Sequence, residues 1–353
     1  MRNLESSLAC SNRIGDGGIL RHRLFFGTFV GMRICLVGSM LRHTVESDAG
    51  TYSGWGGMTE SAVAPFAALL DSASSVIHFV GSVGKEDIEE VKEFYKKNYP
   101  LVDYSGVFVN PAGTDHHHGN KHFIKRRVQL EPTKYEHIES HIQDADVVIF
   151  NFGNIDDIDP EAIKQVKENC KALIYVDVHR KPFGADENGH MYTRGWPGWE
   201  KYLKYADVVQ MDKNECEALF GKKMKNIGDV ISCASKVLDA GAGQALMTLG
   251  ARGILLARKT PAYEYTHIPA APCRVLDTTG SGDALAAGYL VAWHEGGSVI
   301  DAAKMGSLMG ALNCEFVGYM KNMTRERVTE RMPADFAHLT LDPHQKETST
   351  ILV

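Results

Sequence analysis

The segment Asp277-Thr278-Thr279-Gly280-Ser281-Gly282-Asp283 combines small residues with an aspartate that closes it. Apolar, alanine-rich residues follow at 284–290 and predict a helix that begins here. Because the first N–H groups of a helix have no partner within it, small residues at such a start can hold an anion. The Asp283 carboxylate beside that anion could accept the proton of an attacking hydroxyl group. The segment therefore predicts a phosphate-handling site; a glycine-rich turn with Asp283 as an ordinary helix cap is the alternative.

Two further motifs precede this segment. Asn214-Glu215-Cys216-Glu217 follows the apolar run 208–211, and Asn214 and Glu217 share one face of the predicted helix because they are three residues apart. An amide and a carboxylate placed in this way could hold a hydrated magnesium ion; a capping asparagine with a solvated glutamate is the alternative. Thr248-Leu249-Gly250-Ala251-Arg252-Gly253 is a strand end that enters a glycine turn, and by itself it could be a hairpin.

The elements that must position these motifs follow from the apolar pattern. Continuous apolar runs separated by helical sequence predict buried parallel strands in an α/β fold. The runs lie at 34–37, 76–80, 147–150, 173–176, 208–209, 245–247 and 254–256. After Asp277 we expect no further strand, and residues 282–294 and 299–316 are predicted to be helices. Residues 40–56 and 104–130 are rich in glycine, histidine and threonine and predict small antiparallel strands that form a separate flap.

Composition limits the classes of partner and compartment. The 353 residues carry a formal net charge of −6, and no basic cluster exceeds Lys125-Arg126-Arg127, so nucleic acids and anionic membranes are disfavoured. The seven cysteines contain no C-x-x-C pair, which favours reduced thiols in the cytoplasm. No apolar stretch is long enough to span a membrane. We expect residues 1–32 to be an irregular extension, residues 33–332 to form one α/β domain and residues 333–353 to be a tail.

In their order along the chain, these motifs resemble those of the ribokinase (PfkB) family of carbohydrate kinases. The resemblance covers residues 33–330. It rests on Gly56-Gly57, Val83-Gly84-Lys85-Glu86-Asp87, Asp177 with Arg180, Asn214-x-x-Glu217, Thr248-x-Gly250-x-x-Gly253 and the segment from Asp277 to Asp283. It implies a ribokinase-like fold, in which helices flank a central, mainly parallel sheet and a small β lid closes over the sugar. The stretches 40–56 and 104–130 would form that lid, through which family members often dimerise.

The resemblance also implies roles for the residues of the motifs. Asp283 would be the catalytic base, and the backbone amides of Gly280, Ser281 and Gly282 would form the anion hole. Asn214 and Glu217 would organise Mg²⁺, through water, on the donor phosphates of ATP.

On the nucleotide side, the resemblance implies a loop and a pocket border made by Thr248, Gly250, Gly253 and Ser307. Family members often bind a monovalent cation near the anion hole. Asp277 and the Thr279 carbonyl match two ligands of that cation, so activation by K⁺ is a further expectation.

The acceptor side departs from the family pattern. Sugar-binding members commonly carry an aspartate shortly after the first strand and an asparagine after the Gly-Gly pair, where this chain has His43 and Ser61. Neither residue supplies the carboxylate or the carboxamide that would form hydrogen bonds with neighbouring hydroxyls. Ribose is therefore not required as the acceptor, and another polyol, a nucleoside or a sugar acid stays open. The positions expected to contact the acceptor are His43, Gly56, Gly57, Ser61, Asp177 and Arg180.

The run Asp115-His116-His117-His118 invites a metal interpretation. Consecutive side chains diverge in an extended segment, so three adjacent histidines seldom bind one ion. Exposed polar residues of a loop are the first expectation for this run, and lid residues that touch the substrate are the alternative.

The sequence thus predicts a kinase that uses ATP and magnesium to phosphorylate a hydroxyl of a small sugar-like molecule. A nucleoside or vitamin-like alcohol kinase of the same fold is one alternative. A non-catalytic ligand-binding or regulatory homologue is another, against which the complete set of Asp283, Asn214 and Glu217 argues. A homodimer through the lid is the expected assembly.

Overall fold

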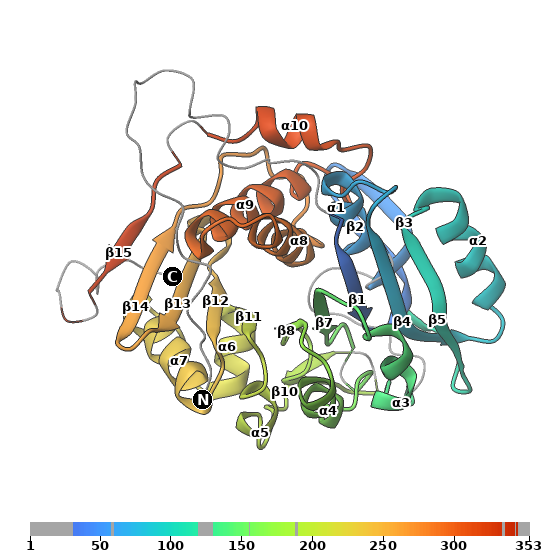
Figure 1. Cartoon of the computed structure of the whole chain (residues 1–353), viewed down its shortest axis with the longest axis horizontal. Helices are drawn as coiled ribbons and strands as arrows, with labels where there is room; N and C mark the ends of the chain where they lie inside the picture. Colours follow the sequence, from blue (N-terminus) through green and yellow to red (C-terminus); the bar gives the residue numbers. More distant parts are fainter. Residues whose placement is uncertain are drawn as a thin grey trace, which may run out of the picture.

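A ten-stranded sheet lies at the centre of the computed structural model, in the order β15-β14-β13-β12-β11-β8-β7-β1-β4-β5 (Figure 1). The structure describes residues 31–57, 60–118, 130–154, 156–187, 190–333, 336–342 and 344. The strands are β1 (Arg33–Val37), β4 (Val76–Gly84), β5 (Val102–Asn110), β7 (Val147–Asn151), β8 (Leu173–Asp177), β11 (Val208–Asp212), β12 (Gln244–Thr248), β13 (Ile254–Lys259), β14 (Tyr263–Ile268) and β15 (Leu339–Leu341). Strands β12 to β5 of this order pair in parallel, and β13, β14 and β15 are antiparallel to their neighbours. The predicted mainly parallel sheet is confirmed.

Helices cover both faces of the sheet (Figure 1). One face carries α1 (Val63–Leu69), α2 (Ile88–Asn98), α8 (Ser281–His294), α9 (Val299–Asn313) and, at its margin, α10 (Arg325–Glu330). The other carries α3 (Tyr135–Ile138), α4 (Glu161–Asn169), α5 (Glu200–Leu203), α6 (Lys213–Phe220) and α7 (Ile227–Ala240), and the 3₁₀ turns are η2 (Glu139–His141) and η3 (Gly250–Arg252). Alternate side chains of β1 enter separate apolar clusters: Ile34 and Leu36 lie on the α8 side, and Cys35 and Val37 on the other. Burial on both faces explains the continuous apolar runs in the sequence.

Helix α8 places Asp283 in its first turn and is buried from Ala284 to Ala292. It packs closely on α9, because a Cβ atom at Gly288 would lie 2.7 Å from the carbonyl oxygen of Met305. The two helices predicted from the sequence are therefore confirmed, although the second ends at Asn313, earlier than expected. The tight packing anchors the functional end of α8.

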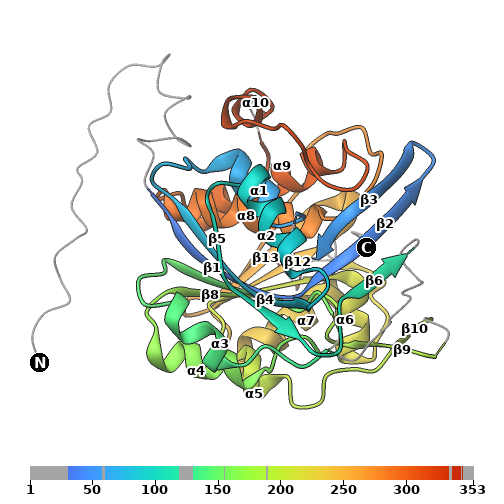
Figure 2. The ribbon, with the colours of Figure 1, turned by 90° about the vertical axis from the view of Figure 1, so that its right-hand side faces the viewer.

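A three-stranded sheet in the order β3-β2-β6 projects beside the main sheet (Figure 2), and we call it the lid. Its strands are β2 (Met40–Ser47), β3 (Gly50–Gly57) and β6 (Asp115–His118). The hairpin of β2 and β3 is antiparallel, whereas β6 runs parallel to β2. The small sheet expected over residues 40–56 is present, and the homodimer through it stays a prediction.

The prediction for residues 104–130 is wrong in its first part. Residues 104–110 belong to β5, which pairs in parallel with β4 at the edge of the main sheet. An edge strand is buried on one face only, so β5 alternates like a lid strand: Val107 is 8% exposed and Val109 is 42% exposed. Residues 119–129, which include most of the remaining predicted lid, lie outside the described residues.

The ends of the chain also differ from expectation. Strand β15 lies in the predicted tail and pairs with β14, so the expectation of no strand after Asp277 is wrong. At the other end, Met32 is fully buried and donates its backbone N–H to Ser75 Oγ at 3.2 Å. The rest of the predicted extension, residues 1–30, lies outside the described residues. Among those described, no helix is long and apolar enough to cross a membrane.

A small two-stranded sheet, β9 (Phe183–Ala185) and β10 (Met191–Thr193), follows β8 and is antiparallel. It belongs to the loop that carries Arg180.

Candidate active site

Four polar residues end adjacent parallel strands at one edge of the sheet. Asn151 ends β7, Asp177 ends β8, Asp212 ends β11 and Thr248 ends β12. These strands are neighbours in the sheet, so their carboxyl ends form one row, the usual place for a ligand in an α/β fold. The start of α8 meets this row, because Asn151 Nδ2 donates a hydrogen bond to Asp283 Oδ1 at 2.8 Å.

The environment of Asp283 suits a general base. Burial raises its pKa to about 6, against hydrogen bonds from Ser61 and Asn151 and the charge of Arg180, which lower it. A carboxylate with this pKa is ionised at neutral pH and still basic enough to take a proton from a hydroxyl group in a transition state. Ser61, expected as an acceptor contact, therefore touches the base itself.

The glycines before Asp283 leave backbone amides free at the start of α8. Gly280 has a φ of 77°, and a Cβ atom there would lie 2.8 Å from Cδ1 of Tyr319. Among the described residues, none accepts a hydrogen bond from the N–H groups of Gly280, Gly282 or Asp283. Together with the dipole of α8, these amides can stabilise an anion beside the base.

A hydrogen-bonded pair behind the helix start holds it in place. Tyr175 donates its hydroxyl hydrogen to Gln210 Oε1 at 2.6 Å, and Gln210 Nε2 donates to the carbonyl oxygen of Gly282 at 3.2 Å. Both residues are buried, in β8 and β11. The turn that carries the amides is therefore tied to the central strands.

The two predicted ligands of a monovalent cation lie in one network. Asp277 Oδ1 accepts hydrogen bonds from the Thr279 N–H at 3.1 Å and hydroxyl at 2.9 Å, and Oδ2 accepts from the Gly318 N–H at 3.0 Å. The fully buried Asn313 donates to the Thr279 carbonyl oxygen at 2.6 Å and accepts from the Met320 N–H at 3.0 Å. The network joins the turn before Asp283 to the segment that follows α9.

A second group of carboxylates lies at the ends of β8 and β11. Asp212 and Glu215 form a capping box at the start of α6, with bonds of 2.8 Å and 2.7 Å between each side chain and the other's backbone N–H. One ligand atom each from Asp177, His179 and Glu215 lies within 4.8 Å of the others. Burial raises the pKa of Asp177 and Glu215 well above the usual range, and neighbouring carboxylates add to the shift. A divalent cation would relieve this repulsion.

The backbone at His179 supports a functional role for this group. His179 has a φ of 43°, and it is one of two non-glycine residues with positive φ among those described. Such conformations are costly and concentrate at functional sites. The turn points Nδ1 of His179 toward Glu215 Oε1, 3.8 Å away.

The predicted magnesium pair, Asn214 and Glu217, does not join this group. Asn214 is exposed, and the Glu217 carboxylate accepts from the Met224 N–H at 2.9 Å and pairs with Lys223 at 2.5 Å. Two helical residues turn a side chain by about 200°, so Glu217 lies on the opposite side of α6 from Glu215. Asp212 and Glu215 have the same i, i+3 spacing two residues earlier, and they are the pair that lies near Asp177.

The nucleotide-side residues lie at the turn after β12 and on α9. Gly250 and Gly253 have φ values of 59° and 91°, and a Cβ atom at Gly253 would lie 2.0 Å from the Ile268 carbonyl oxygen, so the turn requires glycine. Ser307 is buried and donates its hydroxyl hydrogen to the Pro269 carbonyl oxygen at 3.0 Å. Thr248 lies in the same row of strand ends as Asp177.

On the acceptor side, the lid meets the segment after α9. His43 Nδ1 lies 2.7 Å from the Tyr319 hydroxyl oxygen, and a Cβ atom at Gly56 would lie 2.5 Å from His43 Cβ. Gly57 pairs with Met40 across the lid hairpin. Burial and the charge of Arg180 lower the pKa of His43 to about 4, so its imidazole is neutral at pH 7. His43 and Gly56 thus lie side by side in the lid.

Comparison with known proteins supplies the family. A profile described as pfkB family carbohydrate kinase matches residues 118–325. The chain belongs to the pfkB family of carbohydrate kinases. The ribokinase-like fold and the class of enzyme expected from the motifs are thereby confirmed.

Three relatives of this pfkB kinase illustrate the similarity. An ATP-dependent 6-phosphofructokinase of Thermoanaerobacterium thermosaccharolyticum is 24% identical over 306 residues, which cover 81% of this chain and 88% of that enzyme. A 2-dehydro-3-deoxygluconokinase of Escherichia coli is 22% identical over 313 residues, which cover 81% and 96%. The structure of Arabidopsis thaliana ribokinase with ribose and ATP superposes with a TM-score of 0.66 at 19% identity and covers 86% and 99% of the two chains.

Four functional candidates of this pfkB kinase were missed by sequence reasoning: Asn151, Asp212, Glu215 and Tyr319. Asn151 and Asp212 each end an apolar strand, which is a usable signal in an α/β fold. For Tyr319 no local signal exists, because only the fold brings it to His43.

Proposed function

We propose that this pfkB kinase transfers the γ-phosphoryl group of ATP to a hydroxyl of a small sugar-like molecule, with Asp283 as the general base. The observation that carries the proposal is a carboxylate with a pKa of about 6 directly beside the free amides of Gly280 and Gly282. Proton removal from the acceptor and stabilisation of the transferred group can then occur at one place.

In this mechanism the chain orients the base before the acceptor binds. Asn151 donates to Oδ1 of Asp283 at 2.8 Å, and Ser61 donates to the same carboxylate, so the side chain is held in one orientation. The acceptor hydroxyl gives its proton to Asp283 as its oxygen attacks the γ-phosphorus, and the bond from that phosphorus to the β,γ-bridging oxygen breaks to release ADP. The amides at the start of α8 take up negative charge on the transferred group.

We propose that Mg²⁺ binds at the carboxylates of Asp177 and Glu215, with His179 and Asp212 beside them, and not at Asn214 and Glu217. The carboxylate oxygens fit a hard cation, either directly or through water. Bound Mg²⁺ would neutralise charge on the donor phosphates. We assign the nucleotide to the turn of Thr248, Gly250 and Gly253 and to the neighbourhood of Ser307, and we keep Asp277 and Thr279 as the proposed K⁺ ligands.

The test is transfer of phosphate from ATP by the purified protein, with Mg²⁺ and K⁺, to pentoses, hexoses, sugar acids, sugar phosphates, polyols and nucleosides. We expect turnover with one class of acceptor and loss of at least about 1,000-fold in kcat for Asp283→Asn with ATP binding retained. Undiminished turnover by Asp283→Asn would refute the assignment of the base. ATP binding without transfer to any acceptor would favour a ligand-binding or regulatory protein.

A further inference from the structure

Arg180 carries a positive charge to the lid, and it forms no ion pair within the part of the chain that the structure describes. The residue is half-buried, and its guanidinium contacts Nδ1 of His117, in strand β6 of the lid. The charge of Arg180 lowers the pKa of Asp283, so the guanidinium lies near the proposed base. No carboxylate of the described residues lies within 4.0 Å of it.

Arg42 and Lys181 are each paired with a carboxylate, and Arg180 differs from them in this respect. Arg42 of the lid pairs with Asp87 at 2.6 Å and with Glu90 at 2.5 Å. Lys181, the next residue along the chain, pairs with Asp156 at 3.2 Å. Desolvation of an unpaired guanidinium costs free energy, and a bound anion would offset that cost.

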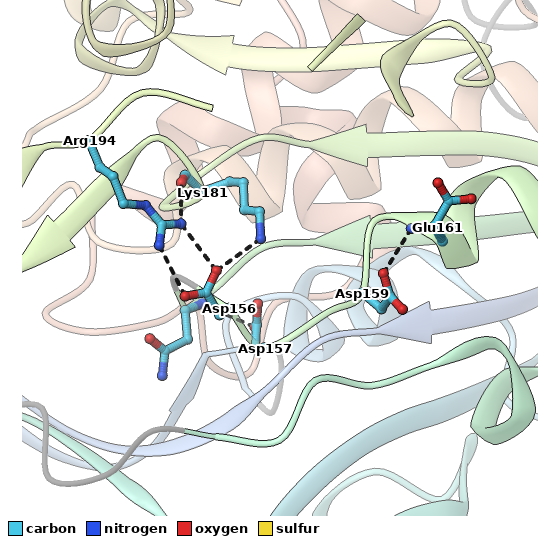
Figure 3. Close-up of polar contacts among 7 residues, drawn as sticks. Asp156, Asp157, Asp159, Glu161, Lys181 and Arg194 are labelled. Atoms are coloured by element: carbon cyan, nitrogen blue, oxygen red, sulfur yellow. Dashed lines mark hydrogen bonds and ion pairs between the residues drawn. The ribbon is translucent and has the colours of Figure 1, made fainter. Parts of the chain in front are cut away.

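The loop around Arg180 is held by its other residues and by the backbone. Asp156 binds Lys181 and also accepts two hydrogen bonds from Arg194, at 3.0 Å and 3.1 Å (Figure 3). The Arg180 N–H donates to the Phe152 carbonyl oxygen at 3.0 Å, and the Arg180 carbonyl oxygen accepts from the Phe183 N–H at 3.1 Å. The guanidinium is thus carried on an ordered backbone, which suits recognition of a ligand.

His43, near the guanidinium, adds no charge at neutral pH, because burial first and then the charge of Arg180 lower its pKa to about 4. Arg180 therefore supplies positive charge here without help from His43. The nearby carboxylates, Asp283 among them, would repel an anionic acceptor without Arg180.

We propose that Arg180 binds a negatively charged group of the acceptor, a carboxylate or a phosphate monoester, so that the acceptor is a sugar acid or a sugar phosphate. The inference rests on the proposed kinase activity, because it assigns the substrate class of the same site. A planar guanidinium can bind either group through two parallel hydrogen bonds. His117, in contact with the guanidinium, would close the lid over the charged end of the acceptor.

The test compares acceptors that differ only in charge. Fructose is paired with fructose 6-phosphate, and a hexose with its aldonic acid, and kcat/KM is measured for each with wild-type protein and Arg180→Gln. In the wild type we expect the charged member of one pair to be preferred by about 100-fold. In Arg180→Gln we expect that preference to fall to within about 3-fold, through loss of activity with the charged acceptor only. The two pairs distinguish a phosphate from a carboxylate.

Two further variants serve as controls. Arg42→Gln removes a lid guanidinium that is already paired and should leave the preference unchanged. Arg180→Lys keeps the charge but cannot form the two parallel hydrogen bonds, so it should retain part of the preference. This variant is measured instead if Arg180→Gln fails to fold.

Each remaining outcome is decisive. A wild-type preference for the neutral acceptors, or a preference for a charged acceptor that Arg180→Gln leaves unchanged, would overturn the inference and leave the kinase standing. An equal loss for charged and neutral acceptors would also overturn it, because Arg180 would then act on the transferred group. If no acceptor is phosphorylated, calorimetric binding of the same four compounds to wild type and Arg180→Gln still decides the inference, whereas the proposed activity fails.

Discussion

Asn151 donates a hydrogen bond from Nδ2 to Oδ1 of Asp283 at 2.8 Å, across 132 positions of the chain. The same Nδ2 donates to Asp177 Oδ2 at 3.1 Å, so one amide links the end of β7 to the base and to the carboxylates at the end of β8. Asn151 thus joins the two halves of the candidate active site.

The activity of the wild-type protein should depend on pH through Asp283. The base must be ionised, and its pKa is raised to about 6, so kcat/KM should fall tenfold per pH unit below about pH 6. Rates measured from pH 4.5 to 8.5 with saturating Mg²⁺ give the acidic limb. A limb near pH 4 would show that Asp283 is not desolvated as the structure indicates.

Asn151→Asp should move that limb to higher pH. A second carboxylate at hydrogen-bond distance from Asp283 replaces a donor by a like charge, which disfavours ionisation of the base. We expect a shift of at least about 1 pH unit. Asn169→Asp, at the exposed end of α4, introduces the same charge elsewhere and should leave the profile unchanged. An unchanged profile in Asn151→Asp would argue against contact between the two side chains.

Asp283→Asn should be at least as stable as the wild type at neutral pH, although it is inactive. The folded-state pKa of Asp283 lies above the ordinary value of 3.8, so folding disfavours its charged form, and stability is lost as pH rises from about 4 to about 6. Urea unfolding at pH 7.5 and pH 4 measures the effect. The advantage of the variant should shrink at the lower pH; an advantage that is independent of pH would contradict the titration of this group.

Glu215 and Glu217 should differ in their effect on metal binding. Glu215→Gln removes a carboxylate from the group with Asp177 and His179, and we expect the affinity for Mg²⁺ or Mn²⁺ to fall about 10- to 100-fold. Glu217→Gln loses a bond to Lys223 on the other side of α6 and should change the affinity less than about 2-fold. Calorimetry with Mn²⁺ in the presence of a non-hydrolysable ATP analogue measures both. The reverse order would restore the pair predicted from the sequence.

Asn313→Ala should destabilise the protein and loosen the anion-hole turn. The variant leaves the Thr279 carbonyl and the buried Met320 N–H without their partner, at a cost of about 2–4 kcal/mol. Chemical denaturation gives this difference directly. Asn98→Ala, which removes an exposed bond to the Phe94 carbonyl, should cost less than about 0.5 kcal/mol. Similar values for the two variants would show that the network around Asp277 adds little stability.

Local patterns were sufficient to predict most of the fold. The strands are buried on both faces, so β1, β7 and β8 appear in the sequence as continuous apolar runs. The start of α8 is equally local, because a run of small residues before a helix leaves amides free wherever the helix lies. Asp283 could therefore be identified as the candidate base from sequence alone. The assignment of β5 failed because an edge strand and a lid strand share one alternation.

Only the folded chain shows which carboxylates lie near Asp283. Asp212-x-x-Glu215 and Asn214-x-x-Glu217 have the same spacing, and the choice between them depends on how α6 is rotated relative to the end of β11. Contacts such as His43 with Tyr319 and Arg180 with His117 join segments that are distant in sequence, so no local pattern reports them. The apolar pattern predicted the central strands, helices α8 and α9 and the glycine-rich turn before Asp283, because these depend on neighbouring residues. The direction in which each side chain points depends on how the helices and strands pack together. That packing is a property of the whole chain.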